Sequence, residues 1–128
     1  MPDNQPTFRH WAPDFDGWPN SWMGVREDLV FGRKLLSYFA EFLQALYVAG
    51  VTRRTFVQYR DNLWLLGGII ISRVSLYDDY QADPLATLII AVEMDDILPD
   101  HHHRMNQAEL RAFSRMCRLF EKHLRQSV

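Results

Sequence analysis

A glycine and a threonine in the middle of the chain separate two long apolar patterns, and this joint constrains the fold more than any other feature. Before the joint, apolar residues recur every three or four positions, which predicts a helix from about Val25 to Ala49. Gly50 can adopt the left-handed conformation that ends a helix, and Thr52 is a suitable N-cap for the next one. The sequence therefore predicts two long helices joined by a short turn.

The segment after Thr52 keeps helical spacing and is apolar on a second face as well. Its first apolar stripe contains Phe56, Tyr59, Leu63, Leu66 and Ile70, and its second face contains Val57, Trp64 and Ile71. The pair Gly67-Gly68 indicates either close approach by a neighbouring element or a bend. A strand over 68–74 is the alternative, although no pairing strand is evident. Residues 73–83 are predicted to form a connection.

Two further helices follow from capping patterns. Asp83 and Pro84 suit the N-cap and first turn of a helix that should end near Asp96. Asn106 and Glu109 resemble a capping box at the start of the last helix. The apolar stripe of that helix contains Leu110, Phe113, Cys117, Phe120 and Leu124. The prediction is an all-α, single-domain bundle of four or five helices, with the domain covering residues 1–128 and the bundle covering residues 24–128.

Residues 1–23 differ from the bundle because they combine prolines with many aromatic side chains. The prolines are Pro2, Pro6, Pro13 and Pro19, which argue against regular helix. The aromatic residues are Phe8, Trp11, Phe15, Trp18 and Trp22. We expect an ordered N-terminal arm whose rings pack along a groove of the bundle. The alternative is an exposed aromatic surface that meets a protein partner, with Trp11, Trp18 and Trp22 as its contact residues.

Composition limits the classes of function. The net charge is −2 and the pI is about 6.2, which argues against coating nucleic acid through bulk charge. Cys117 is the single cysteine, so no intramolecular disulfide can form, and a buried structural thiol is expected. The N-terminus lacks a signal-peptide pattern, and the longest apolar run, Leu63–Ile71, is too short to span a bilayer. We therefore expect a soluble cytoplasmic protein without membrane association.

The joint itself reads Gly-Val-Thr-Arg-Arg-Thr-Phe-Val-Gln-Tyr-Arg from Gly50 to Arg60. Over roughly residues 35–72 the chain resembles the SAM-like core-binding domain of phage-integrase-type tyrosine recombinases. The matching positions are Tyr38, Phe39, Phe42, Leu43, Gly50, Thr52, Thr55, Tyr59 and Leu63. The resemblance implies a module that grips the DNA backbone, with Arg53, Arg54, Thr55 and Arg60 nearest the phosphates. The catalytic pattern of the recombinases does not occur after Ser72. Residues 55–71 also resemble small stand-alone bacterial proteins of unknown function, which implies no activity.

Charged residues are segregated along the chain. The last helix carries a basic stripe that is predicted to face away from the core: Arg111, Arg115, Arg118, Lys122 and Arg125. This stripe could extend a phosphate-binding surface or could be an ordinary solvated face. Residues 77–100 contain seven carboxylates and no Lys or Arg. That acidic block should repel nucleic acid, and could receive the basic stripe of the same chain or of a neighbouring subunit.

No motif of catalysis or cofactor binding is present. Glycine-rich phosphate loops, nucleophile elbows, Cys-x-x-Cys and His-Glu-x-x-His are absent. The one metal-like group consists of Asp95, Asp96, Asp100, His101, His102 and His103. Adjacent histidines point in different directions, so a polar loop is expected. We predict no cofactor, no metal site and no small-molecule substrate. The leading hypothesis is a non-enzymatic adaptor that acts by protein association, including self-association. DNA-backbone binding is the alternative, and an enzyme with a site hidden from the sequence is the third.

Overall fold

The computed structural model describes residues 7–93 and 97–126. Within these ranges the chain forms five α-helices, short 3₁₀ turns and no strand. The helices are α1 (Trp18–Trp22), α2 (Arg26–Val48), α3 (Arg53–Tyr77), α4 (Pro84–Glu93) and α5 (Gln107–Arg125). The 3₁₀ turns are η2 (Phe8–Trp11), η3 (Phe15–Gly17) and η4 (His102–Arg104). The predicted all-α bundle is confirmed.

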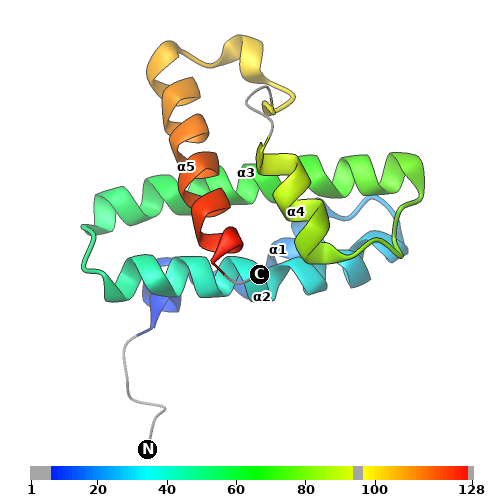
Figure 1. The fold of residues 1–128 in the computed structure, drawn as a ribbon, viewed down its shortest axis with the longest axis horizontal. Coiled ribbons are helices and arrows are strands. Elements are labelled where there is room, and N and C mark those ends of the chain that lie inside the picture. The colour runs from blue at the N-terminus through cyan, green and yellow to red at the C-terminus, as the bar shows by residue number, and fades with distance from the viewer. Residues whose placement is uncertain (1–6, 94–96, 127–128) are drawn as a thin grey trace, which may run out of the picture.

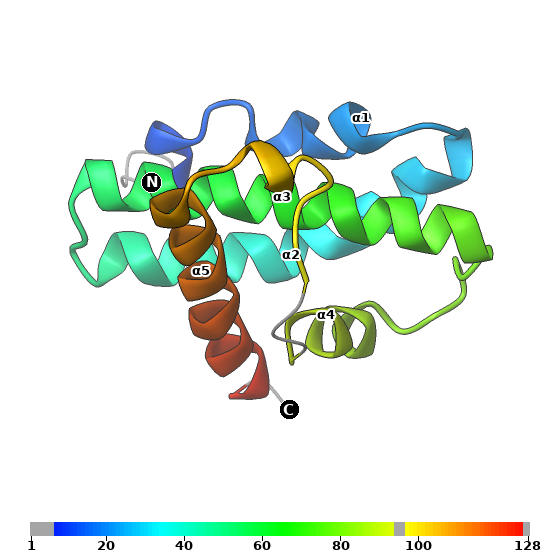
Figure 2. The ribbon, with the colours of Figure 1, turned by 90° about the horizontal axis from the view of Figure 1, so that it is seen from above.

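The two longest helices form the centre of the molecule. α2 and α3 lie side by side as an antiparallel pair (Figure 1). The N-terminal arm and α1 cover one side of this pair, and α4 and α5 cover the other (Figure 2). A single hydrophobic cluster of buried residues includes side chains from the arm and from α2, α3, α4 and α5. Residues 97–106, which precede α5, cross over α3 on the side that faces the viewer in Figure 2.

The joint between α2 and α3 is built as capping chemistry predicts. Gly50 has φ +83°, the left-handed conformation that glycine adopts most easily. The Oγ1 of Thr52 accepts a hydrogen bond from the N–H of Thr55 at 3.2 Å, which satisfies one donor at the start of α3. Gly50 specifies the end of α2 and Thr52 specifies the start of α3. Because these two residues are so close in sequence, the helices fold back on each other without a long loop.

α3 is longer than the sequence suggested. Residues 68–74 are helical, so the strand alternative was wrong. The predicted connection over 73–83 was also wrong at its start, because α3 continues to Tyr77 and buries Val74 on the way. The helix ends where Asp78 takes φ +55°. Aspartate tolerates this conformation less readily than glycine does, so the stop carried no obvious signal in the sequence.

The pair Gly67-Gly68 marks a close approach, and the approaching group is the indole ring of Trp22. A Cβ atom on Gly67 would lie 2.2 Å from the Cζ2 atom of Trp22. The Nε1 of Trp22 also donates a hydrogen bond to the carbonyl oxygen of Trp64 at 3.1 Å. The absence of a side chain at Gly67 therefore makes the space in which the end of the arm docks on α3.

The described part of the arm packs on the bundle, as predicted. Its buried rings are Phe8, Phe15 and Trp18. Trp11 is half-buried and makes edge-to-face contacts with Tyr47, at a centroid distance of 4.9 Å, and with Phe56, at 5.4 Å. The arm thus contributes core to both central helices.

The prediction that prolines exclude helix from the arm was wrong for residues 18–22. Pro19 stands in the first turn of α1, where its missing N–H would have no intrahelical partner in any case. The Oγ of Ser21 donates a hydrogen bond to the carbonyl oxygen of Trp18 at 2.6 Å. A proline at this position therefore starts a short helix instead of preventing one.

A buried carboxylate organises the first turn of α2. Asp28 is only 3% exposed, and its Oδ2 accepts hydrogen bonds from the N–H groups of Gly24, at 2.9 Å, and Val25, at 3.0 Å. Its Oδ1 accepts a hydrogen bond from the hydroxyl of Tyr80 at 2.7 Å, and that hydroxyl also lies 3.2 Å from the Oγ of Ser75. Burial raises the pKa of Asp28, but these hydrogen bonds outweigh it, so the pKa of Asp28 is lowered. This cluster ties the connection after α3 to the start of α2.

The caps of the last two helices agree with prediction. The Oδ2 of Asp83 accepts a hydrogen bond from the N–H of Ala86 at 2.9 Å. Asn106 and Glu109 exchange the two hydrogen bonds of a capping box, at 2.8 and 2.9 Å. The predicted end of α4 near Asp96 lies outside the described residues. Among the helices of residues 7–93 and 97–126, none is long and apolar enough to cross a membrane.

Cys117 provides a test of the packing of α5. The side chain is 1% exposed, and burial raises the pKa of its thiol to about 12. Since the thiolate is the reactive form, we expect native Cys117 to react with a disulfide reagent such as DTNB roughly a thousandfold more slowly than the unfolded chain does. Absorbance of the released thiolate, with and without guanidinium, measures both rates. Similar rates in the two conditions would contradict the packing described here.

Candidate functional site

Three adjoining hollows follow the edge of α3 that is left open between the arm and the segment before α5. Their volumes are about 410, 270 and 350 Å³, and Leu65 lines all three. The floor is a helical stripe with alternating spacings of three and four residues: Gln58, Asp61, Leu65, Gly68 and Ser72. We call this floor, together with its two walls, the α3 groove.

The walls come from segments that are far apart in the sequence. The arm and α1 supply Asp14, Trp18, Ser21 and Trp22. The opposite wall consists of Pro99, Asp100, His101, Met105, Asn106, Ala108, Glu109 and Ala112. Figure 2 looks down on the edge of α3 between these two segments. The groove is therefore a product of tertiary packing, with rigid helix as its floor.

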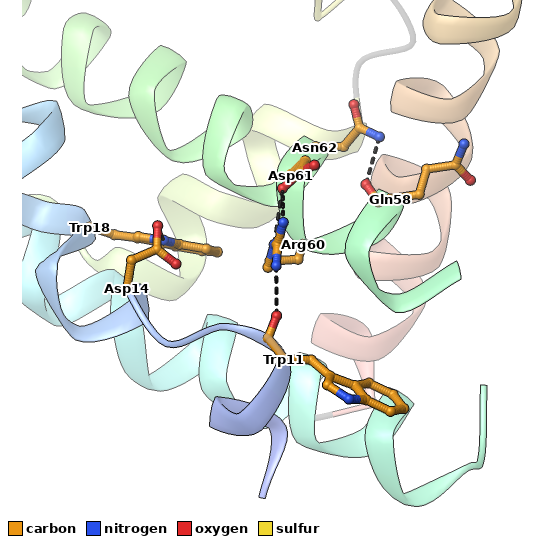
Figure 3. A network of polar contacts seen from close by, with 7 residues as sticks. All are labelled: Trp11, Asp14, Trp18, Gln58, Arg60, Asp61 and Asn62. Carbon is orange, nitrogen blue, oxygen red and sulfur yellow. Dashed lines mark hydrogen bonds and ion pairs between the residues drawn. The ribbon is translucent and has the colours of Figure 1, made fainter. Parts of the chain in front are cut away.

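Arg60 joins the groove to the arm. One guanidinium nitrogen donates a hydrogen bond to the carbonyl oxygen of Trp11 at 2.7 Å (Figure 3). The Nε and the other nitrogen donate to the Oδ1 of Asp61 at 3.0 and 2.8 Å. Beside this pair, the side-chain amide of Asn62 donates to the carbonyl oxygen of Gln58 at 2.9 Å. Arg60 thus has two intramolecular acceptors, and its charge is balanced by Asp61.

Trp64 is the large aromatic side chain of the groove. It lines the two hollows nearest the arm and is 38% exposed. Its Nε1 donates a hydrogen bond to the Oγ of Ser21 at 2.9 Å, which fixes the orientation of the ring. The sequence places Trp64 on the second apolar face of this helix. Only the position of α1 beside α3 shows that part of the ring remains open.

The groove carries net negative charge. Four carboxylates line it, those of Asp14, Asp61, Asp100 and Glu109, against the single guanidinium of Arg60. A concave surface lined by one sign of charge attracts ligands of the opposite sign. Together with the ring of Trp64, the charges suit an apolar segment that also carries Lys or Arg.

Of the residues predicted nearest to DNA phosphates, three lie in the first turn of α3 and Arg60 is hydrogen-bonded within the fold. Arg53 and Arg54 are exposed in the first turn of α3. Thr55 is half-buried, and its N–H is taken by Thr52. Arg60 instead reaches the arm. Within residues 7–93 and 97–126, Arg53 and Arg54 have no ion-pair partner, and they lie at the end of α3 where the helix dipole disfavours positive charge.

The basic stripe of α5 does not face solvent along its whole length. Arg118 donates a hydrogen bond to the carbonyl oxygen of Val92, at the C-terminal end of α4, and pairs with Glu121 at 3.1 Å. Arg125 pairs with Glu93 at 3.1 Å and with Glu121 at 2.9 Å. The expected outward stripe was therefore wrong at Arg118, which is half-buried because α4 packs against that side of α5. The exposed members are Arg111, Arg115, Lys122 and Arg125, and the charge of Arg125 is paired with Glu93 and Glu121.

The predicted partner-binding tryptophans are held within the fold. Trp18 is 2% exposed, whereas Trp11 and Trp22 are half-buried against the central helices. Substitution of these residues would disturb the core, so it could not isolate an effect on association.

The histidine run does not converge on one point. The rings of His102 and His103 are perpendicular, with centroids 5.9 Å apart, and the Nδ1 of His102 lies 3.0 Å from the carbonyl oxygen of Pro99. His101 lines the α3 groove. Across residues 7–93 and 97–126, no three His, Cys, Asp or Glu side chains are arranged to hold a metal ion.

Neither protein-family models, nor curated proteins, nor solved structures match this chain. The resemblance of residues 35–72 to a recombinase core-binding domain accordingly stays a prediction.

Proposed function

We propose that this protein is a non-enzymatic association module that binds a basic, amphipathic segment of a partner protein in the α3 groove. The observation that carries the proposal is the groove itself, where four carboxylates lie around the apolar side chain of Leu65 and a partly open Trp64. An amphipathic helix binds such a groove by placing apolar anchors against its apolar side chains and charged groups beside its carboxylates. Lysine and arginine stems would pack on Trp64 while their charged ends approach the carboxylates.

The internal use of arginines also supports protein association over DNA binding. Arg60 and Arg118 donate to backbone carbonyl groups, and Arg125 pairs with two glutamates. Each cation engaged in this way is less available to phosphate. A polyanion would also meet the carboxylates of the α3 groove, which repel it.

Binding can be measured with a fluorescein-labelled 14-residue peptide of leucine and lysine in helical spacing. We expect fluorescence anisotropy to show micromolar affinity that weakens as salt rises, because the attraction is partly electrostatic. The same peptide with glutamate at every lysine position should not bind. Equal binding of both peptides would contradict a groove that selects cations.

Variants test the location of binding. The triple substitution Asp14→Asn, Asp61→Asn and Glu109→Gln keeps acceptor oxygens but removes three charges from the groove. It should weaken binding of the lysine peptide by roughly tenfold or more, which corresponds to about 1.4 kcal/mol. The matched control makes the same charge change at exposed positions outside the groove: Glu27→Gln, Glu41→Gln and Asp78→Asn. If both triple variants lose affinity equally, the effect is one of net charge and the site is not the groove.

DNA-backbone binding is the second candidate, and the exposed pair Arg53 and Arg54 favours it. The positive end of α3 makes this an unfavourable place for cations unless an anion is bound. A labelled duplex, titrated at about 50 and 200 mM salt, tests it directly. Binding at low salt that is lost when both arginines are changed to alanine would support the DNA function. No binding at low salt would exclude it.

A further inference from the structure

A second surface, separate from the α3 groove, is formed by the end of α3 and by α4. α4 is apolar on nearly all sides, and a helix of that kind is normally covered on all sides. Here Ile90 is 57% exposed, and the neighbouring Tyr77 at the end of α3 is 69% exposed. Large apolar side chains that are exposed side by side mark a contact surface more often than scattered ones do.

The same surface contains a hollow. Its volume is about 300 Å³, and it is lined by Ile70, Arg73, Val74, Tyr77, Asp79, Ala82, Thr87, Ile90 and Ala91. None of these residues lines the α3 groove. The surface therefore offers both projecting side chains, Tyr77 and Ile90, and an apolar recess of a size that such side chains can enter.

The charges at the recess are of both signs. Arg73 and Asp79 are exposed on its lining. Within the part of the chain that the structure describes, neither side chain has an ion-pair partner. A surface with one unpaired cation and one unpaired anion can pair both charges with those of an identical copy related by a two-fold axis that passes between them.

We propose that a second copy of this chain covers the surface, in a two-fold symmetric dimer. Tyr77 and Ile90 of each protomer enter the apolar recess of the other. Arg73 of each protomer pairs with Asp79 of the partner subunit. The dimer leaves the α3 groove open, so each protomer keeps its own peptide-binding site.

Sedimentation equilibrium tests the dimer. We expect the mass of the full chain to approach twice the protomer mass at micromolar to tens of micromolar concentration. Ile90→Arg should shift the dissociation constant upward by at least about tenfold, because it places a charge in the apolar contact. Val48→Arg is the matched control. Val48 is 74% exposed and is the last residue of α2, at the end of the central helix pair away from Tyr77. Circular dichroism verifies that both variants are folded.

A charge swap distinguishes this dimer from any other. Arg73→Asp and Asp79→Arg should each weaken the dimer, and the double variant should restore it. A chain that stays monomeric up to several hundred micromolar would overturn the proposal, as would a dimer that Ile90→Arg does not affect. Failure to rescue in the double variant would overturn the two-fold pairing. The lysine-peptide assay on Ile90→Arg separates the two surfaces, because peptide binding should be unchanged whether or not the dimer forms.

Discussion

Replacing Gly67 with alanine should destabilise the protein by about 2–4 kcal/mol, although alanine is normally the better helix former by about 1 kcal/mol. The reason is the ring of Trp22, whose Cζ2, Cη2 and Cε2 atoms would lie 2.2, 2.5 and 2.7 Å from the new Cβ atom. The ring cannot simply rotate away, because two contacts hold it. Its Nε1 donates a hydrogen bond to the carbonyl oxygen of Trp64, and the ring lies perpendicular to that of Phe39 at a centroid distance of 5.9 Å. Chemical denaturation measures the loss.

Gly68 supplies the matched control for this substitution. A Cβ atom there would meet the Cδ1 atom of Trp22 at 3.5 Å, an ordinary contact. We therefore expect Gly68→Ala to be neutral or to stabilise the protein by up to about 1 kcal/mol. In a Trp22→Ala background, Gly67→Ala should also become neutral or stabilising, because the clash has been removed. A loss of the same size with and without the Trp22 ring would show that the ring does not occupy the space above Gly67.

The second large effect is expected at Asp28. Replacing it with asparagine should reduce the free energy of unfolding at neutral pH by about 2–3 kcal/mol. An amide can still accept from Tyr80 on one side, but its NH₂ group would face the N–H groups of Gly24 and Val25, which are donors. Denaturant titration of the variant measures the loss. Tyr80→Phe should cause a smaller loss, since it removes only one of the hydrogen bonds to the carboxylate.

The contribution of Asp28 should depend on pH with a defined sign. Because its pKa is lowered by folding, the native state favours the charged carboxylate. Its stabilisation is fully present above the pKa of the unfolded chain, near 4, and is lost as pH falls through the lower pKa of the folded state. The difference in unfolding free energy between the native chain and Asp28→Asn should therefore narrow below about pH 4. A difference that stays constant from neutral pH to about pH 3 would contradict the hydrogen bonding described for this carboxylate.

The elements that could be predicted are those with a local physical cause. Gly50 with Thr52, and Asn106 with Glu109, satisfy backbone groups within a few residues, so the sequence alone indicates these ends. The end of α3 was missed because Asp78 adopts a conformation that is usually assigned to glycine. The glycine pair on α3 indicated a close neighbour, but its identity as Trp22 depends on the docking of the arm.

The candidate site could not be predicted in the same way. Its floor is one stripe of α3, but its walls are residues 14–22 and 99–112, which meet only in the folded chain. The sequence shows which residues are basic, but it does not show which of them form hydrogen bonds within the fold, because their acceptors are far away along the chain. Arg60 reaches Trp11, and Arg118 reaches Val92, over 49 and 26 positions respectively. Charge patterns in a sequence thus overstate the cations that a folded surface keeps available.

The measurement that tests the central claim most directly is a map of amide chemical shifts in ¹⁵N-labelled protein, recorded as the unlabelled lysine–leucine peptide is added. Binding in the α3 groove predicts that the largest changes fall on Asp61, Leu65 and His101 and on the indole N–H of Trp64. Residues of the α3–α4 surface, such as Ile90, should change little. Changes centred on Ile90, on Arg53 and Arg54, or spread evenly over the molecule would contradict the groove as the binding site.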